Sequence, residues 1–315
     1  GSGKPLRSAS RRAVFEGIER FCVASPPTSP PIAIDSFSNI SEPALDPNAF
    51  TAYAREQLQR PDFPYRNMDQ HSAVTWYRAI GRDGKPVLVP SDYIFMNQEK
   101  PSVYCDLTTS GCAAHVDRKQ AMMSALLELV ERDCAIRHWL SAERRPHADK
   151  SKLPRQIHAR LSQLSSAGYD VYIIDCSLYA PIFAFEVLIV RRDGSRPAAF
   201  VTSAASLEPI DAVVKALREA EAALYLASAI ENMAGIRHLS ASEVMTPEDH
   251  GTFYRDPANA TMLSHYQEPS SMMRLGANDA GPGRKADHCQ LDHVLQLLQE
   301  QGLAVAFYDL TLPAI

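Results

Sequence analysis

The stretch "DRKQAMMSALLELVERDCAIRHWL", residues 117–140, is the longest helical pattern in the sequence. Its apolar residues recur three and four positions apart, which predicts a helix with one face in the core. The predicted core face consists of Met122, Ala125, Leu126, Leu129 and Val130. A step of about 100° per residue also predicts a polar stripe within an arc of roughly 80° on this helix. The stripe consists of Gln120, Ser124, Glu128 and Glu131.

A motif within this stretch has an earlier copy. The segment "LLELVERDC", residues 126–134, repeats the pattern of "VFEGIERFC", residues 14–22: Glu-x-x-Glu-Arg among apolar residues, followed by a cysteine. The earlier copy predicts a helix over residues 8–22. Its predicted apolar stripe is Val14, Ile18 and Phe21. Because positions three and four apart share a helix face, its polar group lies beside that stripe. This polar group consists of Glu16, Glu19 and Arg20.

Two interpretations of the paired carboxylates stay open at this point. Carboxylates on converging helices repel one another unless cations lie between them, and Mg²⁺ prefers hard oxygen ligands. Alternatively, both are surface helices with internal Glu–Arg pairs, each worth about 0.3 kcal/mol. A third predicted helix, "DAVVKALREAEAAL" at residues 211–224, aligns on the same frame. It has Glu219 at the first acidic position and Ala222 at the second.

Composition and charge exclude several classes of function. Apolar residues make up 45% of the 315-residue chain, which is enough for a large core. The sequence has no apolar run of membrane-spanning length and no signal pattern, so we expect a cytoplasmic protein without a membrane partner. The net charge of -5 argues against nucleic acid as a partner. The six cysteines are scattered, which is typical of reduced, buried thiols.

The remaining segments predict a mixture of helices and strands. Residues 74–90 read as a hairpin that turns at Asp83-Gly84, and Asp46-Pro47 is expected to open a helix through about residue 59. The region of about 245–287 is rich in polar residues, glycine and proline, so we expect it to be irregular or mobile.

A helix, a glycine and a strand follow one another twice. The first unit spans residues 161–177 around Gly168, and the second spans residues 295–311 around Gly302. Each has an aspartate seven residues after the glycine, for which we favour a packing role over a direct functional one. The chain is therefore expected to have an internally repeated architecture.

Four segments together resemble the YcaO-domain family. "TSGCAAHVDRKQAMMSALLELVERDCAIRHWL" (residues 109–140) is similar to the family's signature loop and helix. "GKPLRSASRRAVFEGIERF" (residues 3–21), "TSAASLEPIDAVVKALREA" (residues 202–220) and "GLAVAFYDLTLPAI" (residues 302–315) resemble other family segments in the expected order. The resemblance implies an α+β fold with mixed sheets, packed helices and one YcaO-like domain over residues 1–315.

This resemblance also implies a nucleotide site that uses ATP and Mg²⁺. The implied magnesium ligands are Glu16, Glu19, Gln120, Glu128 and Glu131. The implied nucleotide-binding residues are Lys4, Arg20, Ser124, Arg132 and Glu219. Three positions depart from the family pattern: Gln120 replaces a common glutamate, Ala222 an expected glutamine and Arg12 a frequent serine. We also expect the family's Pro-rich C-terminal tail to be lacking.

The implied activity is cyclodehydration of a ribosomally made precursor peptide during natural product biosynthesis. A Cys, Ser or Thr side chain attacks the preceding amide, and ATP phosphorylates the resulting oxyanion, which gives a thiazoline or oxazoline. The alternatives are thioamide formation and a non-catalytic scaffold that binds the precursor for a partner enzyme. No enzyme nucleophile is required, so Cys112 and Cys134 are expected to be structural. We expect an E1-like or similar leader-peptide-binding partner protein, and a homodimer is left open.

Overall fold

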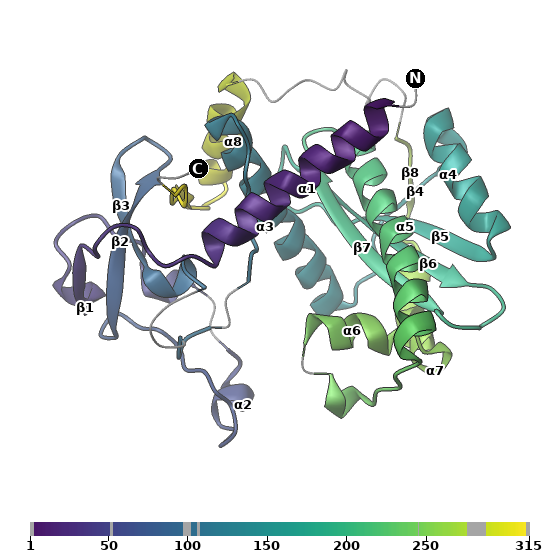
Figure 1. The fold of residues 1–315 in the computed structure, drawn as a ribbon, viewed down its shortest axis with the longest axis horizontal. Helices are drawn as coiled ribbons and strands as arrows, with labels where there is room; N and C mark the ends of the chain where they lie inside the picture. The colour runs from purple at the N-terminus through teal and green to yellow at the C-terminus, as the bar shows by residue number, and fades with distance from the viewer. Residues whose placement is uncertain are drawn as a thin grey trace. The chain divides into compact units, whose positions relative to one another are not determined.

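The computed structural model in Figure 1 describes residues 3–50, 53–96, 102–105, 108–244, 246–275 and 288–312. It combines helices and sheets, as the predicted α+β class requires. The chain divides into two compact units. Unit 1 comprises Gly1–Ala125 and His288–Ile315, and unit 2 comprises Leu126–Asp287. The expectation of a single domain stays a prediction.

Unit 1 contains a four-stranded antiparallel sheet built around its longest strand, β2. The strands are β1 (Ala33–Ser36), β2 (Ala73–Gly81), β3 (Pro86–Pro90) and β9 (Ala306–Phe307). β2 pairs with each of the other three, and β2 and β3 form the predicted hairpin. Trp76 at its centre is fully buried and donates its indole N–H to the carbonyl of Asp35 over 2.9 Å.

The helices of unit 1 are α1 (Gly3–Val23), α2 (Arg55–Leu58), α8 (His288–Glu300) and the first turns of α3 (Arg118–Ser141). One helix predicted for this unit differs from the structure. The helix expected from Asp46 to residue 59 is wrong as a continuous element. Asp46 caps only a short 3-10 turn, Pro47–Ala49, by accepting the N–H of Asn48 over 2.9 Å. The next residue, Phe50, is extended and ends that turn.

The helix predicted over residues 8–22 is confirmed within α1, and part of its apolar stripe is exposed. Val14 is 59% exposed and Phe21 is 60% exposed. Among the described side chains of α1, burial is limited to Cys22 and Val23 in the last turn. Helical periodicity predicted this helix but does not indicate how far each side chain of its apolar stripe is buried.

Unit 2 is a five-stranded sheet covered on both faces. The strand order is β7-β6-β5-β4-β8, and β5, β6 and β7 form an antiparallel meander. The strands are β4 (His147–Ala148), β5 (Tyr169–Asp175), β6 (Phe183–Arg191), β7 (Ala199–Ser206) and β8 (Met272–Met273).

Alternating side chains of the meander enter two cores in unit 2. One core lies under α4 (Arg155–Ser166) and α5 (Pro209–Ala234) and includes Ile157, Val187 and Leu217. The other includes Leu188 and Leu263. The strands place residues of opposite parity on opposite faces, which explains this division. Both faces of the sheet are therefore apolar, as in a three-layered arrangement.

The predicted core face of α3 is confirmed in part. Ala125, Leu126 and Val130 are buried, and Met122 is half-buried. The prediction that Leu129 belongs to the core is wrong, because half of its surface is exposed. It lies at the margin of the apolar stripe, next to the polar residue Glu128.

The region expected to be irregular is partly ordered. Residues 246–275 contain α6 (Pro247–Phe253), α7 (Pro257–Ala260) and a 3-10 helix, Thr261–Gln267. Thr246 and Asp256 cap the two α-helices, each of which begins with a proline at its first position. Polar composition here reflects capping and turns, so the prediction is wrong for this part. Residues 276–287 lie outside the described residues.

The two helix–glycine–strand units are confirmed in layout. Gly168 (φ +90°) and Gly302 (φ +84°) both adopt the left-handed conformation that ends a helix and favours glycine. The strands β5 and β9 that follow belong to different sheets. Asp175 and Asp309 each accept the backbone N–H two residues on, from Ser177 at 2.9 Å and Thr311 at 3.0 Å. These bonds support the local structural role expected for both aspartates.

Candidate functional site

The first Glu-x-x-Glu-Arg copy lies on an exposed part of α1. Arg20 Nη2 lies 3.1 Å from Glu16 Oε1, and both side chains are 61% exposed. Glu19 is half-buried on the same helix. The side chain of Lys4 lies outside the described residues, although its backbone belongs to α1. Water screens the Glu16–Arg20 pair, which therefore adds little to stability.

The second copy lies in the middle of the continuous helix α3. Asp117 precedes the helix and accepts the N–H of Gln120 over 2.9 Å. Glu128 pairs with Arg132 at 3.0 Å, which repeats the spacing of the pair on α1. Gln120 is half-buried and Ser124 is exposed. The helix therefore presents the predicted polar stripe over three turns.

Glu131 differs from the other candidates because its carboxylate is bonded to strand β7. It accepts the hydroxyl of Ser203 over 2.8 Å and the N–H of Ala205 over 3.2 Å. Burial raises the pKa of Glu131, although the two hydrogen bonds and the charge of Arg132 oppose this rise. The carboxylate is thus held in place, and its charged form would gain from a nearby cation.

Lys215 on α5 supplies positive charge beside this carboxylate. Its Nζ donates to the carbonyl of Ala205 over 3.3 Å. Burial lowers the pKa of Lys215, while the charges of Asp211 and Glu131 oppose that effect. The residue is nevertheless exposed, so a ligand can reach its side chain. Glu219, one turn further along α5, is exposed.

Sequence reasoning missed both Lys215 and Ser203. Helical periodicity describes one helix at a time. It therefore cannot predict a hydrogen bond between Glu131 and a strand more than 70 residues away. The available signal was the position of Lys215, four residues before Glu219 and hence on the same face of α5.

The donor atoms of these residues fit a magnesium–nucleotide group. Carboxylate oxygens are the hard ligands that Mg²⁺ prefers, and Arg20, Arg132 and Lys215 can neutralise phosphate charge. Within the described ranges, no three His, Cys, Asp or Glu side chains form a metal-binding group. The expected ligands are divided between the units, with Glu16, Glu19 and Gln120 in unit 1. The magnesium site therefore stays a prediction.

Two of the described cysteines, Cys134 and Cys176, do not resemble nucleophiles. Burial raises the pKa of Cys134 to about 11. It also raises the pKa of Cys176 well above its ordinary value. A thiol with such a pKa is protonated near neutral pH. This agrees with the structural role expected for Cys134.

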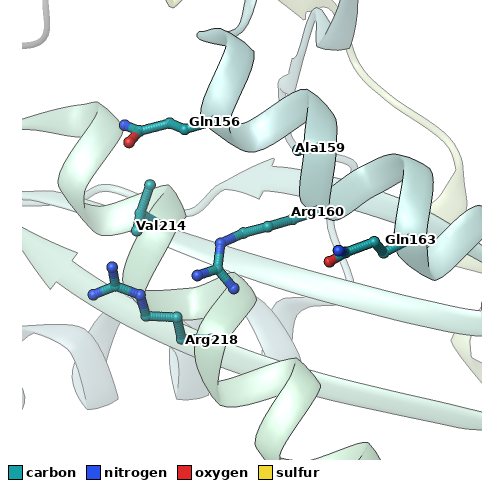
Figure 2. Close-up of a pocket in the computed structure, with 6 residues that line it drawn as sticks. All are labelled: Gln156, Ala159, Arg160, Gln163, Val214 and Arg218. Atoms are coloured by element: carbon teal, nitrogen blue, oxygen red, sulfur yellow. The ribbon is translucent and has the colours of Figure 1, made fainter. Parts of the chain in front are cut away.

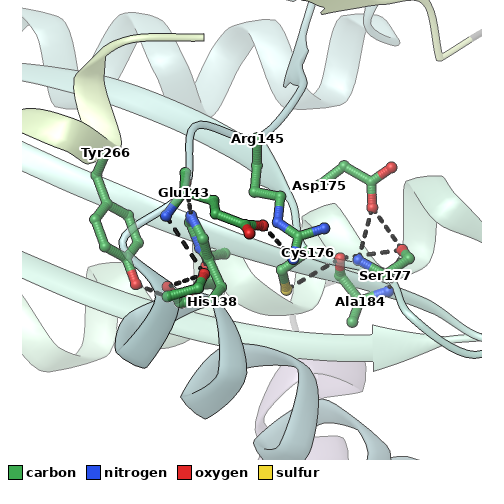
Figure 3. Close-up of polar contacts among 10 residues, drawn as sticks. His138, Glu143, Arg145, Asp175, Cys176, Ser177, Ala184 and Tyr266 are labelled. Carbon is green, nitrogen blue, oxygen red and sulfur yellow. Dashed lines mark hydrogen bonds and ion pairs between the residues drawn. The ribbon is translucent and has the colours of Figure 1, made fainter. Parts of the chain in front are cut away.

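A second group of polar contacts lies in unit 2 (Figure 3). His138 Nδ1 forms a hydrogen bond with a carboxylate oxygen of Glu186, and its Nε2 lies 3.0 Å from the carbonyl of Glu143. Tyr266 donates its hydroxyl to the other carboxylate oxygen of Glu186 over 3.1 Å. His138 and Glu186 are 1% and 2% exposed. The cluster fixes the end of α3 to β6, and the side chains of His138 and Glu186 are too deeply buried to touch a substrate.

None of the helices in the described part of the chain combines the length and the apolar character needed to span a bilayer.

Solved structures share the fold of this chain at low sequence identity. A structure entitled heterocyclase in complex with substrate and cofactor has a TM-score of 0.75 and 18% identity. The alignment covers 95% of this chain and 40% of that one, so the present chain spans well under half of its length.

Two further structures have similar scores. YcaO from Methanopyrus kandleri, bound with AMPPCP and Mg²⁺, has a TM-score of 0.65, 18% identity, and coverage of 96% and 71% of the two chains. An E. coli microcin synthetase McbBCD complex with pro-MccB17 bound has a TM-score of 0.63, 17% identity, and coverage of 91% and 71%. No curated protein matches the chain.

The family comparison covers the whole sequence. Residues 1–315 match the family described as YcaO cyclodehydratase, ATP- and Mg²⁺-binding. This description confirms the cofactors that the resemblance implied. With every residue of the chain included in the match, the protein belongs to the YcaO family.

Proposed function

We propose that the protein uses ATP and Mg²⁺ to activate a backbone amide of a ribosomally made precursor peptide and forms thiazoline or oxazoline rings. The observation that carries this proposal is the whole-chain match to the YcaO cyclodehydratase family. Two structures of similar fold, a heterocyclase in complex with substrate and a microcin synthetase complex with pro-MccB17 bound, support a peptide substrate and partner proteins. We place the reaction in the cytoplasm.

The carboxylates of both motif copies are the proposed magnesium ligands. They are Glu16, Glu19, Glu128 and Glu131, and the side-chain carbonyl oxygen of Gln120 is proposed to join them. Bound Mg²⁺ would neutralise the phosphate charge of ATP. The hydrogen bonds from β7 support this role for Glu131, since they hold the carboxylate before any ligand arrives.

Cationic side chains are the proposed phosphate-binding groups. Lys4, Arg20 and Arg132 follow from the family resemblance. Lys215 follows from its position beside Glu131, since its Nζ donates to the carbonyl of Ala205, whose N–H donates to Glu131. Ser124 and Glu219 complete the proposed nucleotide contacts.

In the proposed reaction the enzyme positions two reactants and supplies no nucleophile. The substrate's thiol or hydroxyl adds to the carbonyl carbon of the preceding amide and loses its proton. The carbonyl oxygen takes the γ-phosphoryl group of ATP, which leaves ADP. The C–O bond then breaks, phosphate departs and the ring nitrogen loses a proton to give the C=N bond. Positioning and neutralisation of charge provide the catalysis.

The decisive experiment measures phosphate release and peptide mass together. The purified chain is incubated with ATP, Mg²⁺, a Cys/Ser/Thr-rich precursor encoded beside its gene, and any partner protein encoded there. Precursor-dependent ATP hydrolysis with loss of one water per ring is the expected result. Replacement of oxygen by sulfur would instead indicate thioamide formation. Precursor binding without ATP hydrolysis would indicate a scaffold, which the departures at Gln120 and Ala222 would explain.

A further inference from the structure

A groove between α4 and α5 in unit 2 has no role in the proposed chemistry. Both helices pack on the same face of the sheet, with Ile157 and Leu217 in one shared core. The groove has a volume of about 390 Å³ (Figure 2). It is lined by Gln156, Ala159, Arg160, Gln163, Val214 and Arg218. This volume lies in the range of small-ligand and peptide-anchoring sites.

The groove carries positive charge. Helix α4 contains no Asp or Glu, whereas Arg160 and Arg218 both line the groove. Arg160 forms an ion pair with Glu221 on α5, which orients its guanidinium. In the part of the chain that the structure describes, Arg218 takes part in no ion pair, and its side chain is exposed. The guanidinium of Arg218 is therefore a cation that a ligand in the groove can bind.

The arrangement of polar groups matches an extended peptide. Gln156 and Gln163 lie seven residues apart on α4, which corresponds to roughly 10 Å along the helix. Three residues of an extended chain span about the same length. Glutamine amides both donate and accept hydrogen bonds, as peptide groups do. Ala159 and Val214 supply an apolar surface between them.

We propose that this groove binds a short, extended, acidic segment of the precursor peptide, with one carboxylate held by Arg218. Charge complementarity selects an acidic segment, and the guanidinium fork suits a carboxylate. This inference rests on the proposed function, since it takes the partner to be the precursor. The segment is not the part that is modified, because it binds on a different face of α5 from Lys215 and Glu219. Val214 and Arg218 each precede those residues by one position, or about 100° around the helix.

The test measures peptide binding in the absence of ATP. A rhodamine-labelled Gly/Ser peptide with a central Asp-Glu-Asp is compared with its Asn-Gln-Asn counterpart by fluorescence anisotropy at low salt. We expect the full-length protein to bind the acidic peptide about tenfold more tightly, since charge-assisted hydrogen bonds are the stronger kind. Arg218→Glu should abolish that preference. Arg155→Glu is the matched control, because Arg155 is an exposed arginine on α4 that does not line the groove. It should change the preference less than twofold, or about 0.4 kcal/mol.

Three results would overturn the inference. In the first, the wild type binds the two peptides equally. In the second, Arg218→Glu and Arg155→Glu lose the preference for the acidic peptide to the same extent. In the third, inorganic phosphate displaces the acidic peptide at the concentration at which phosphate by itself binds the protein. Circular dichroism checks the fold of each variant, and ATP binding should stay unchanged in Arg218→Glu.

The outcomes also separate this inference from the proposed function. A charge preference that depends on Arg218, in a protein that never hydrolyses ATP with its precursor, would support the groove and contradict the cyclodehydratase. Precursor-dependent ATP hydrolysis without any charge preference would do the reverse.

Discussion

Helix α1 and helix α3 carry the same Glu-x-x-Glu-Arg motif but hold their carboxylates differently. Each has an ion pair between its first glutamate and its arginine, Glu16–Arg20 at 3.1 Å and Glu128–Arg132 at 3.0 Å. On α3, Glu131 additionally accepts two hydrogen bonds from β7. One copy is largely solvated, and the other is joined to a sheet.

The difference lies in what each copy contributes to the fold. An exposed Glu–Arg pair contributes little to stability, and the proposed role of the pair on α1 is ligand binding. Glu131 contributes to the packing of α3 on β7 as well. Four predictions test this comparison.

The largest expected effect is the loss of ATP turnover. We expect Glu16→Gln and Glu131→Gln each to reduce turnover by about a hundredfold or more, because a metal site tolerates reduced repulsion but not the loss of a ligand. Phosphate release and circular dichroism are read together, with Glu56→Gln on the exposed face of α2 as the control. Full activity in both variants would remove the two-helix site and leave Glu131 as a structural residue.

The second expected effect is on stability, and it should separate the two copies. Glu131→Ala leaves the Ser203 hydroxyl and the Ala205 N–H without their acceptor, so we expect a loss of about 2–3 kcal/mol. Glu16→Ala should cost about 0.5 kcal/mol or less. Urea unfolding measures both, and adding Ser203→Ala completes a double-mutant cycle. Equal losses in the two alanine variants would contradict the comparison.

A third, smaller effect is the pH dependence of stability. The folded-state pKa of Glu131 is raised, chiefly by burial, so the folded protein holds this proton more tightly than the unfolded chain. Its stabilising contribution is thus complete below the unfolded pKa of about 4.5 and is lost as the pH rises through the folded value. Relative to Glu131→Gln, the wild type should therefore lose stability as the pH rises from about 4.5 through the folded-state pKa of Glu131. Urea titrations at several pH values, with Glu16→Gln as the control, would show no such trend if Glu131 were fully solvated.

The smallest effect concerns Gln120, where the polar stripe of α3 departs from the family pattern. Restoring a carboxylate by Gln120→Glu should strengthen attraction for Mg²⁺ and lower by a few-fold the Mg²⁺ concentration for half-maximal ATP binding. Calorimetric titration of ATP at several Mg²⁺ levels measures this shift. An unchanged or higher requirement would mean that Gln120 does not contribute to the magnesium site.

Local sequence patterns predicted the elements better than they predicted burial. The hairpin, the long helix α3 and both helix–glycine–strand units follow from periodicity and glycine placement. Exposure of Val14 and Phe21 could not be predicted in this way, because it depends on what covers α1. The capped, proline-initiated helices between residues 246 and 275 were not predicted, because the polar composition of this segment is also typical of irregular structure.

The candidate site shows the same limit. Helical spacing brought Glu128 and Glu131 to one face of α3, but the anchoring of Glu131 depends on β7, which is remote in sequence. The position of Lys215 beside that carboxylate likewise requires the packing of α5 on the sheet. Nothing in the local sequence indicates that His138 would meet Glu186 in the core.

The pairing of β9 with β2 has a consequence for biosynthesis. The β5–β6–β7 meander and α5 arise from one uninterrupted segment, residues 169–234, so their contacts can form soon after that segment leaves the ribosome. The sheet of unit 1 instead joins Ile80 to Phe307. The edge of β2 that pairs with β9 stays unpaired until more than 200 further residues have been synthesised. It can therefore mispair during translation. Chaperone dependence is therefore expected to concentrate on unit 1.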